Sequence, residues 1–186
     1  MPKVQKRQFL FGLKGGALLI PALSGICFGQ YKWEIKNPLP LENNFTSVAY
    51  VKDQFVAVGD AGAILTSTDG TSWTAKSSGT TNMLNAMTYG NNLYVAVGNS
   101  GTIVTSTDGA TWTSKNSGTS SNLNSIVFGG NQFVAVGGQG MILTSSDGIT
   151  WTEQNSGTFV NLRALTFGNN QFVVAGEWIQ SATIGP

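Results

Sequence analysis

The chain has 186 residues, with ten lysine and arginine side chains, nine aspartate and glutamate side chains, and no histidine. Twenty-four glycines, 10% charged residues and 10% aromatic residues favour a turn-rich all-β domain over a helical or disordered one. The absence of histidine excludes histidine-based acid–base catalysis, histidine triads and histidine metal ligands.

Residues 1–29 differ in character from the rest of the chain. A basic start that includes Lys6 and Arg7 precedes an apolar run over 17–23 and small residues near Gly29. This order is typical of a secretory signal, through either the general or the twin-arginine route. We therefore expect an exported protein, periplasmic or extracellular, with an uncleaved membrane anchor or a lipid on Cys27 as the alternatives.

Residues 30–186 form the predicted repeat domain. Cys27 is the only cysteine, so this domain has no disulfide and no thiolate metal site. It carries six positive and nine negative side chains, a net charge of −3. Such a surface lacks the basic patch that phosphate binding requires, so nucleic acid is not an expected partner. A membrane contact is expected only through residues 1–29, if they are retained.

A 39-residue period runs without a gap from Phe45 to Gly176. It is carried by Trp73, Trp112 and Trp151 and by Phe45, Leu84, Leu123 and Leu162. The period predicts units at 45–83, 84–122 and 123–161 and a partial unit at 162–186.

Each unit contains four short β-like runs. In the second unit these runs cover 84–89, 93–97, 102–106 and 111–115, and turn residues separate them. Four antiparallel strands in about 40 residues are typical of a β-propeller blade. The predicted fold is therefore an all-β propeller of four-stranded antiparallel blades, about four in number, in a ring that is either closed or incomplete.

One turn motif recurs in every complete unit. An aspartate in such a turn accepts backbone N–H groups, and the tryptophan packs across the hairpin, so the motif is interpreted as structural. Its members are Ser67, Asp69, Gly70, Trp73, Ser106, Asp108, Gly109, Trp112, Ser145, Asp147, Gly148 and Trp151.

This turn resembles a shortened form of the Asp-box (BNR) repeat of sialidase-type propellers. The whole unit, over residues 33 to about 176, is similar to the repeats of the photosystem II assembly and stability factor family. The likeness is carried by Leu162-Arg163-Ala164-Leu165, the aromatic-Val-Ala-Val-Gly run and the Thr-Ser-x-Asp-Gly-x-x-Trp turn. The resemblance implies a non-catalytic propeller that binds protein on the end opposite the Asp-box turns.

The end opposite the Asp-box turns is the predicted binding rim. The fourth-to-first connections and the second-to-third turns meet there, and Arg163 is the only arginine of 30–186. The alternative is a solvated channel mouth without a ligand. The candidate residues are Arg163, Asn124, Asn85, Thr46, Asp60, Asn99, Gln139 and Glu177.

The number of blades stays open. An orphan fourth strand is predicted at 32–36, around Trp33, and the repeat pattern fails from Glu177. Either Trp33–Lys36 pairs with the C-terminal segment and closes a four-bladed ring, or the chain is a piece of a larger propeller. An open arc would expose unpaired edges and self-associate.

The leading functional prediction is an exported scaffold that binds protein and is not an enzyme. The alternatives are a carbohydrate-binding or degenerate sialidase- or glycosidase-type Asp-box module and a cell-surface structural repeat. Asp60 and Glu177 were the candidate carboxylate pair, but the matching residues Asn99 and Gly138 indicate solvated loop positions. No catalytic, cofactor-binding or metal-binding residue is predicted.

Overall fold

The computed structural model describes residues 10–15, 31–36, 43–177 and 181–184. These residues form one two-stranded, three four-stranded and one three-stranded sheet, all antiparallel between neighbours. Within them, no helix combines the length and apolar character needed to cross a membrane.

The strands follow the 39-residue period. The first sheet contains β3 (Phe45–Val51), β4 (Gln54–Gly59), β5 (Ile64–Ser67) and β6 (Thr74–Lys76). The second contains β7 (Leu84–Gly90), β8 (Leu93–Gly98), β9 (Ile103–Ser106) and β10 (Thr113–Lys115). The third contains β11 (Leu123–Gly129), β12 (Gln132–Gly137), β13 (Ile142–Ser145) and β14 (Thr152–Gln154). The fourth contains β15 (Leu162–Gly168), β16 (Gln171–Gly176) and β17 (Ser181–Ile184).

Local sequence explains these hairpins. Between β7 and β8, Asn91 and Asn92 both have positive φ values, 47° and 59°, which asparagine tolerates better than most residues. Between β8 and β9, a short 3₁₀ turn, Asn99–Gly101, places Ser100 and Gly101 at positive φ. The same turn recurs at Asp60–Gly62 and Gly138–Gly140.

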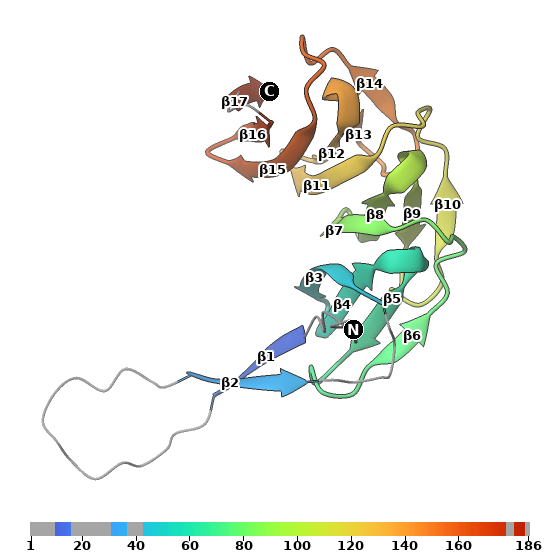
Figure 1. Cartoon of the computed structure of the whole chain (residues 1–186), viewed down its shortest axis with the longest axis vertical. Helices are drawn as coiled ribbons and strands as arrows, with labels where there is room; N and C mark the ends of the chain where they lie inside the picture. The colour runs from blue at the N-terminus through green and yellow to red at the C-terminus, as the bar shows by residue number, and fades with distance from the viewer. Residues whose placement is uncertain (1–9, 16–30, 37–42, 178–180, 185–186) are drawn as a thin grey trace, which may run out of the picture.

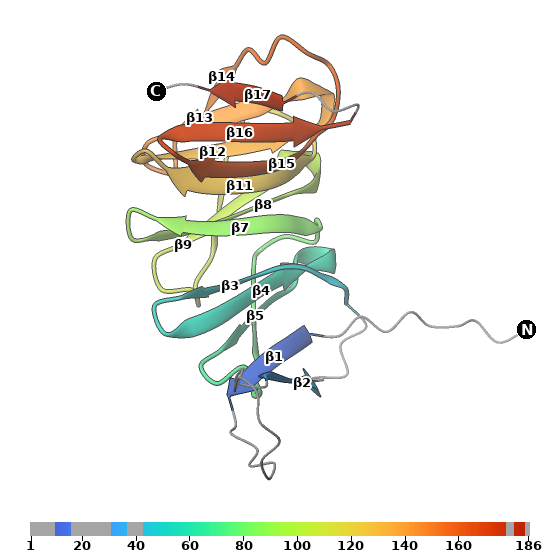
Figure 2. The same cartoon turned by 90° about the vertical axis from the view of Figure 1, so that its left-hand side faces the viewer.

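The sheets follow one another along an open arc (Figure 1). The first strands of the sheets, β3, β7, β11 and β15, line the concave side, and β6, β10 and β14 lie on the outer side. A view from the side shows the first three sheets stacked in chain order, with the fourth overlapping the third in this view (Figure 2). The predicted all-β architecture of four-stranded antiparallel blades is confirmed, and the arc is not closed.

Of the two arrangements that the sequence left open, a closed four-bladed ring and an incomplete propeller, the closed ring is not seen in the described part of the chain. β2 (Tyr31–Lys36) pairs with β1 (Leu10–Gly15), from Leu10 opposite Lys36 to Gly15 opposite Tyr31. The C-terminal strand β17 pairs with β16 instead. The alternative in which Trp33–Lys36 pairs with the C-terminal segment is therefore not the one that this structure has, because these strands lie at opposite ends of the arc (Figure 1).

The core lies between consecutive sheets. We call the side of a sheet that meets the preceding sheet its front face, and the opposite side its rear face. Met87 and Tyr94, on the front face of the second sheet, pack with Val56 and Val58 on the rear face of the first. Equivalent clusters fill the next two junctions. Each fully buried side chain of this size contributes about 1.5–3 kcal/mol, so the junctions stabilise the arc.

Candidate functional site

A β-bulge occurs at the same place in the first strand of each of the four sheets that follow the repeat. In β7 the register passes from Leu84–Gly98 to Ala86–Val97, which leaves Asn85 as the extra residue. The equivalent residues of the other sheets are Thr46, Asn124 and Arg163. A bulge changes the direction in which its side chain points, so four of the predicted rim residues have a common backbone origin.

Three of these bulge side chains join adjacent sheets. The Thr46 hydroxyl donates to the backbone carbonyl of Leu84 at 2.6 Å. The side-chain amides of Asn85 and Asn124 donate to the carbonyls of Leu123 at 2.8 Å and Leu162 at 2.7 Å. We call these bonds the inter-sheet clamps. These three predicted rim residues therefore connect adjacent sheets of the arc.

The turns between the second and third strands of the sheets are also hydrogen-bonded to neighbouring segments. Asp60 accepts a 2.7 Å hydrogen bond from the Asn44 side chain, and Asn99 accepts a 3.0 Å bond from Asn85. The backbone N–H of Gln139 donates to the Asn161 side-chain oxygen at 3.2 Å. These bonds connect each turn either to the start of its own inner strand or to the following connection.

Arg163 has a different setting from its three counterparts. Its guanidinium donates to a carboxylate oxygen of Glu177 in the same sheet, and no following sheet occurs within the described residues. Glu177 also accepts a 3.1 Å bond from the Asn161 side chain. The hydrogen bond from Arg163 lowers the pKa of Glu177. The two side chains are 61% and 38% exposed, so this pair is available to a partner.

Phe159 is a rim residue that the sequence predictions missed. Its side chain is 92% exposed in the connection between β14 and β15. The connection is fixed beside it, because the backbone N–H of Gly140 donates to the Val160 carbonyl at 2.8 Å. The equivalent residues in the earlier units are Thr81 and Ser120, so a phenylalanine here was a visible departure from the repeat.

The recurring turn motif has the geometry of a structural element. In the second unit, Asp108 Oδ1 accepts the backbone N–H groups of Ala110 and Thr111, both at 2.8 Å. These bonds lower the pKa of Asp108 to about 2. Trp112 Nε1 donates to the Gly109 carbonyl at 3.1 Å, and its ring centroid lies 6.2 Å from that of Tyr94.

The other two copies of the motif repeat this arrangement. Asp69 and Asp147 accept equivalent bonds, which lower the pKa of Asp69 and bring that of Asp147 to about 2. The hydroxyls of Ser67, Ser106 and Ser145 accept from the backbone N–H groups of Gly70, Gly109 and Gly148, each at 2.8 Å. The Trp73 and Trp151 side chains donate to the carbonyls of Gly70 and Gly148.

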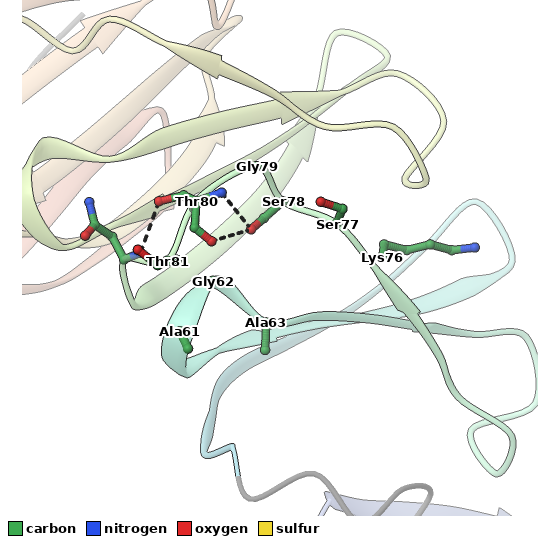
Figure 3. Close-up of a pocket in the computed structure, with 10 residues that line it drawn as sticks. Ala61, Gly62, Ala63, Lys76, Ser77, Ser78, Gly79, Thr80 and Thr81 are labelled. Carbon is green, nitrogen blue, oxygen red and sulfur yellow. Dashed lines mark hydrogen bonds between the residues drawn. The ribbon is translucent and has the colours of Figure 1, made fainter.

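A polar hollow of about 610 Å³ lies where the first sheet meets the connection to the second (Figure 3). The turn at Ala61–Ala63 forms one side, and residues 76–82 form the other. The Ser78 hydroxyl donates to the Thr80 carbonyl at 3.2 Å and accepts from the Thr80 N–H at 3.3 Å. Lys76 supplies the one charged side chain of this lining.

The described residues contain no cluster of three or more cysteine, aspartate or glutamate side chains that could hold a metal ion. Asp60 and Glu177 belong to different sheets and have different hydrogen-bond partners. The arrangement therefore offers hydrogen-bonding and apolar contacts rather than a paired-carboxylate geometry among these residues.

One family model matches the chain, over residues 4–115 and again over 77–153. It is described as the DUF6242 β-propeller domain. The two matches overlap, as expected for a repeat that can align in more than one phase. No curated protein matches the sequence.

Solved structures resemble the arc at low sequence identity. YCF48 bound to a D1 peptide shares 17% identity with a TM-score of 0.64, covering 81% of this chain and 54% of that one. The computationally designed Ika4 protein shares 18% with a TM-score of 0.67, covering 85% and 99%. An ancestral GH74 enzyme shares 17% with a TM-score of 0.56, covering 82% and 27%. The chain thus spans about half the length of YCF48, and these likenesses show the propeller fold.

Proposed function

The chain belongs to the DUF6242 β-propeller family, and from that premise we propose that it is an exported, non-catalytic scaffold that binds a protein partner. The contact surface is the fourth-sheet rim, which we define as Phe159, Arg163 and Glu177. The observation that carries this proposal is that all three side chains retain exposed surface and none joins two sheets.

The chemistry of the rim supports a protein partner. Aromatic and arginine side chains contribute most of the binding energy at many protein interfaces. Phe159 offers apolar surface on a connection whose backbone is already hydrogen-bonded, so little ordering is required on binding. Arg163 has five N–H donors, of which Glu177 uses only part, so the guanidinium can also bind a partner carboxylate or carbonyl.

The likeness to YCF48 also supports a protein partner. That protein has been solved bound to a D1 peptide. The repeat of this chain resembles those of the photosystem II assembly and stability factors. We transfer from them the general role, the capture of a polypeptide segment, to the fourth-sheet rim of this chain.

Capture from a membrane extract tests this proposal. Immobilised full-length protein is compared with Arg163→Ala and Phe159→Ala, and retained proteins are quantified by mass spectrometry. Each substitution is expected to reduce the specific partner by about tenfold, the effect of losing about 1.4 kcal/mol. The control is Asn116→Ala, an exposed residue of another connection. If all variants retain the same proteins in the same amounts, the fourth-sheet rim is not the binding surface.

Export is a separate part of the proposal and has a separate test. The basic and apolar segment 1–29 supports it. Cell fractionation of a carboxy-terminally tagged chain should find the protein outside the cytoplasm. Replacement of Lys6 and Arg7 by glutamine should leave it inside.

A carbohydrate ligand is the second candidate, and the polar hollow in Figure 3 favours it. The hollow presents hydroxyl groups and the Lys76 ammonium, which suit a sugar rather than an apolar ligand. A glycan array would then show saccharide binding that Lys76→Ala weakens and Arg163→Ala leaves unchanged. If Arg163→Ala weakens saccharide binding and Lys76→Ala does not, the saccharide binds at the fourth-sheet rim and not in the hollow.

A further inference from the structure

The fourth sheet lacks one strand in the described part of the chain. β17 pairs with β16 in the phase of the repeat: Phe172 lies opposite Ile184, as Phe133 lies opposite Ser145 in the third sheet. In the other three sheets a three-residue strand covers the outer edge of the third strand. No described strand covers that edge of β17.

The three complete sheets show which sequence covers this edge. Each covering strand directly follows a tryptophan, in the segments Trp73-Thr-Ala-Lys, Trp112-Thr-Ser-Lys and Trp151-Thr-Glu-Gln. The segment Trp33-Glu-Ile-Lys has the same form and lies within β2. One edge of β2 pairs with β1, and no described strand pairs with the other.

The geometry of the arc decides which copy supplies the strand. β2 and β17 lie at opposite ends of the arc in both views, so β2 does not reach β17 of its own chain (Figures 1 and 2). We propose that the free edge of β17 accepts β2 of a second copy as its fourth strand. This inference goes beyond the proposed partner binding and does not depend on it.

The repeat fixes the register of this pairing. In the third sheet, Ile142 lies opposite Gln154, Leu143 opposite Glu153 and Thr144 opposite Thr152. Counting 39 residues forward from β13 and aligning Trp33 with Trp151 gives the intermolecular pairs. They are Ser181 with Lys36, Ala182 with Ile35, and Thr183 with Glu34. The addition uses the edge of β2 that does not pair with β1, so it neither displaces β1 nor requires it.

Exposed apolar surface supports the same arrangement. Strand addition brings the front face of the second copy's first sheet toward the rear face of the fourth sheet. On the front face, Val48 is 52% exposed, whereas the equivalent Met87 and Ile126 are 7% and 4% exposed at internal junctions. On the rear face, Val173 is 39% exposed and the equivalent Val134 is 0% exposed. Both surfaces are of the kind that each internal junction buries.

Cysteine cross-linking tests the pairing in the full chain. In a Cys27→Ser background, one chain carries Ile35→Cys and another carries Ala182→Cys. The two are mixed and oxidised with copper phenanthroline. A disulfide-linked heterodimer is expected, because directly opposite strand residues can meet the distance requirement of a disulfide. The matched control replaces Ala182→Cys with Ala110→Cys, an exposed position in the turn between β9 and β10.

Two further measurements complete the test. Light scattering of the wild type should give at least twice the mass of one chain, and Ile35→Pro should reduce it to one chain by removing a strand N–H. Circular dichroism checks that this variant stays folded. A wild type that is monomeric at every concentration, with no cross-link above the control, would overturn the proposal. So would a cross-link formed only within a single chain that carries both cysteines.

Discussion

At the residue scale, two glycines with the same backbone conformation differ in their surroundings. Gly101 and Gly118 have φ values of +66° and +74°. A Cβ atom on Gly101 would overlap the carbonyl oxygen of Thr119, whereas one on Gly118 would meet nothing within 4 Å. The first glycine therefore serves a close approach of two backbone segments, and the second serves only the turn.

We predict that Gly101→Ala destabilises the protein more than Gly118→Ala. The positive φ alone should cost about 1–2 kcal/mol in both variants. The overlap with Thr119 should add about 1–3 kcal/mol in the first. Urea unfolding at neutral pH measures both free energies, and equal losses would contradict the role assigned to the close approach.

The turn aspartates make a prediction about pH. The folded-state pKa of Asp108 is lowered to about 2 by two backbone N–H donors, and the unfolded value is about 3.9. The stabilisation is therefore fully present above about pH 4 and is lost as the pH falls through about 2. Asp108→Asn should be less stable than the wild type at pH 7.

The difference between these two proteins should shrink between about pH 4 and pH 2, because the wild type alone loses the charge of Asp108 there. Unfolding by urea across this range gives both stability curves. The pKa values of Asp69 and Asp147 are lowered in both proteins, so the stability of each still depends partly on pH in this range. Parallel curves would show that the Asp108 carboxylate does not stabilise its turn.

The sequence located the rim residues but not all of their roles. The repeat made positions 46, 85 and 124 visible as one equivalent set, yet nothing in it indicated that a bulge directs them to the next sheet. Their hydrogen bonds depend on the distance between sheets, which strand patterns do not encode. Phe159, in contrast, could have been recognised as an apolar departure from a polar repeat position.

At the scale of the elements, the inter-sheet clamps should contribute measurably to stability. Asn85→Ala leaves the Leu123 carbonyl without its side-chain donor and is expected to cost about 1–3 kcal/mol. The matched control is Asn116→Ala, an exposed asparagine that bonds only within its own connection, with a change of about 0.5 kcal/mol or less. Chemical denaturation of both variants measures the difference, and similar losses would show that the clamp is dispensable.

Most strands could be predicted because glycine and asparagine turns separate short apolar runs. β1, which lies in the segment predicted as an export signal, and β17 are the exceptions. No Asp-Gly turn follows Glu177, and Trp178, directly after it, is out of phase with Trp73, Trp112 and Trp151, so the expected pattern ended there. The structure nevertheless contains β17 in the register of the repeat. Backbone pairing with β16 depends on an available strand edge more than on the identity of the residues that fill it.

At the scale of the whole molecule, burial should vary with position along the arc. Val48 and Ile126 occupy the same place in their units but are 52% and 4% exposed. In dilute protein, Ile126→Ala should cost about 2–5 kcal/mol and Val48→Ala about 0.5 kcal/mol. Urea unfolding tests this pair. Comparable losses would mean that the front face of the first sheet is covered as well as an internal junction is.

The curvature of the arc could not be predicted from the sequence. Unit composition predicts that sheets stack, because each has two apolar faces that need cover. Whether four sheets close a ring depends on the small rotation between neighbours, which results from sheet twist and the sizes of facing side chains such as Met87 and Val56. The predicted propeller fold was therefore correct, and of the two arrangements left open for its ends, closure through Trp33 does not occur in the described residues.

The equivalence of the three junctions has a consequence for how such genes change. Each sheet carries a front face that fits the rear face of any other, so duplication of 117 base pairs, one unit of 39 codons, adds a sheet without creating an unmatched surface. Loss of one unit is tolerated for the same reason. Unequal crossing-over between the codons of the recurring Asp-Gly turns thus offers a route to arcs of different length, with Phe159 and Arg163 carried unchanged on their own unit.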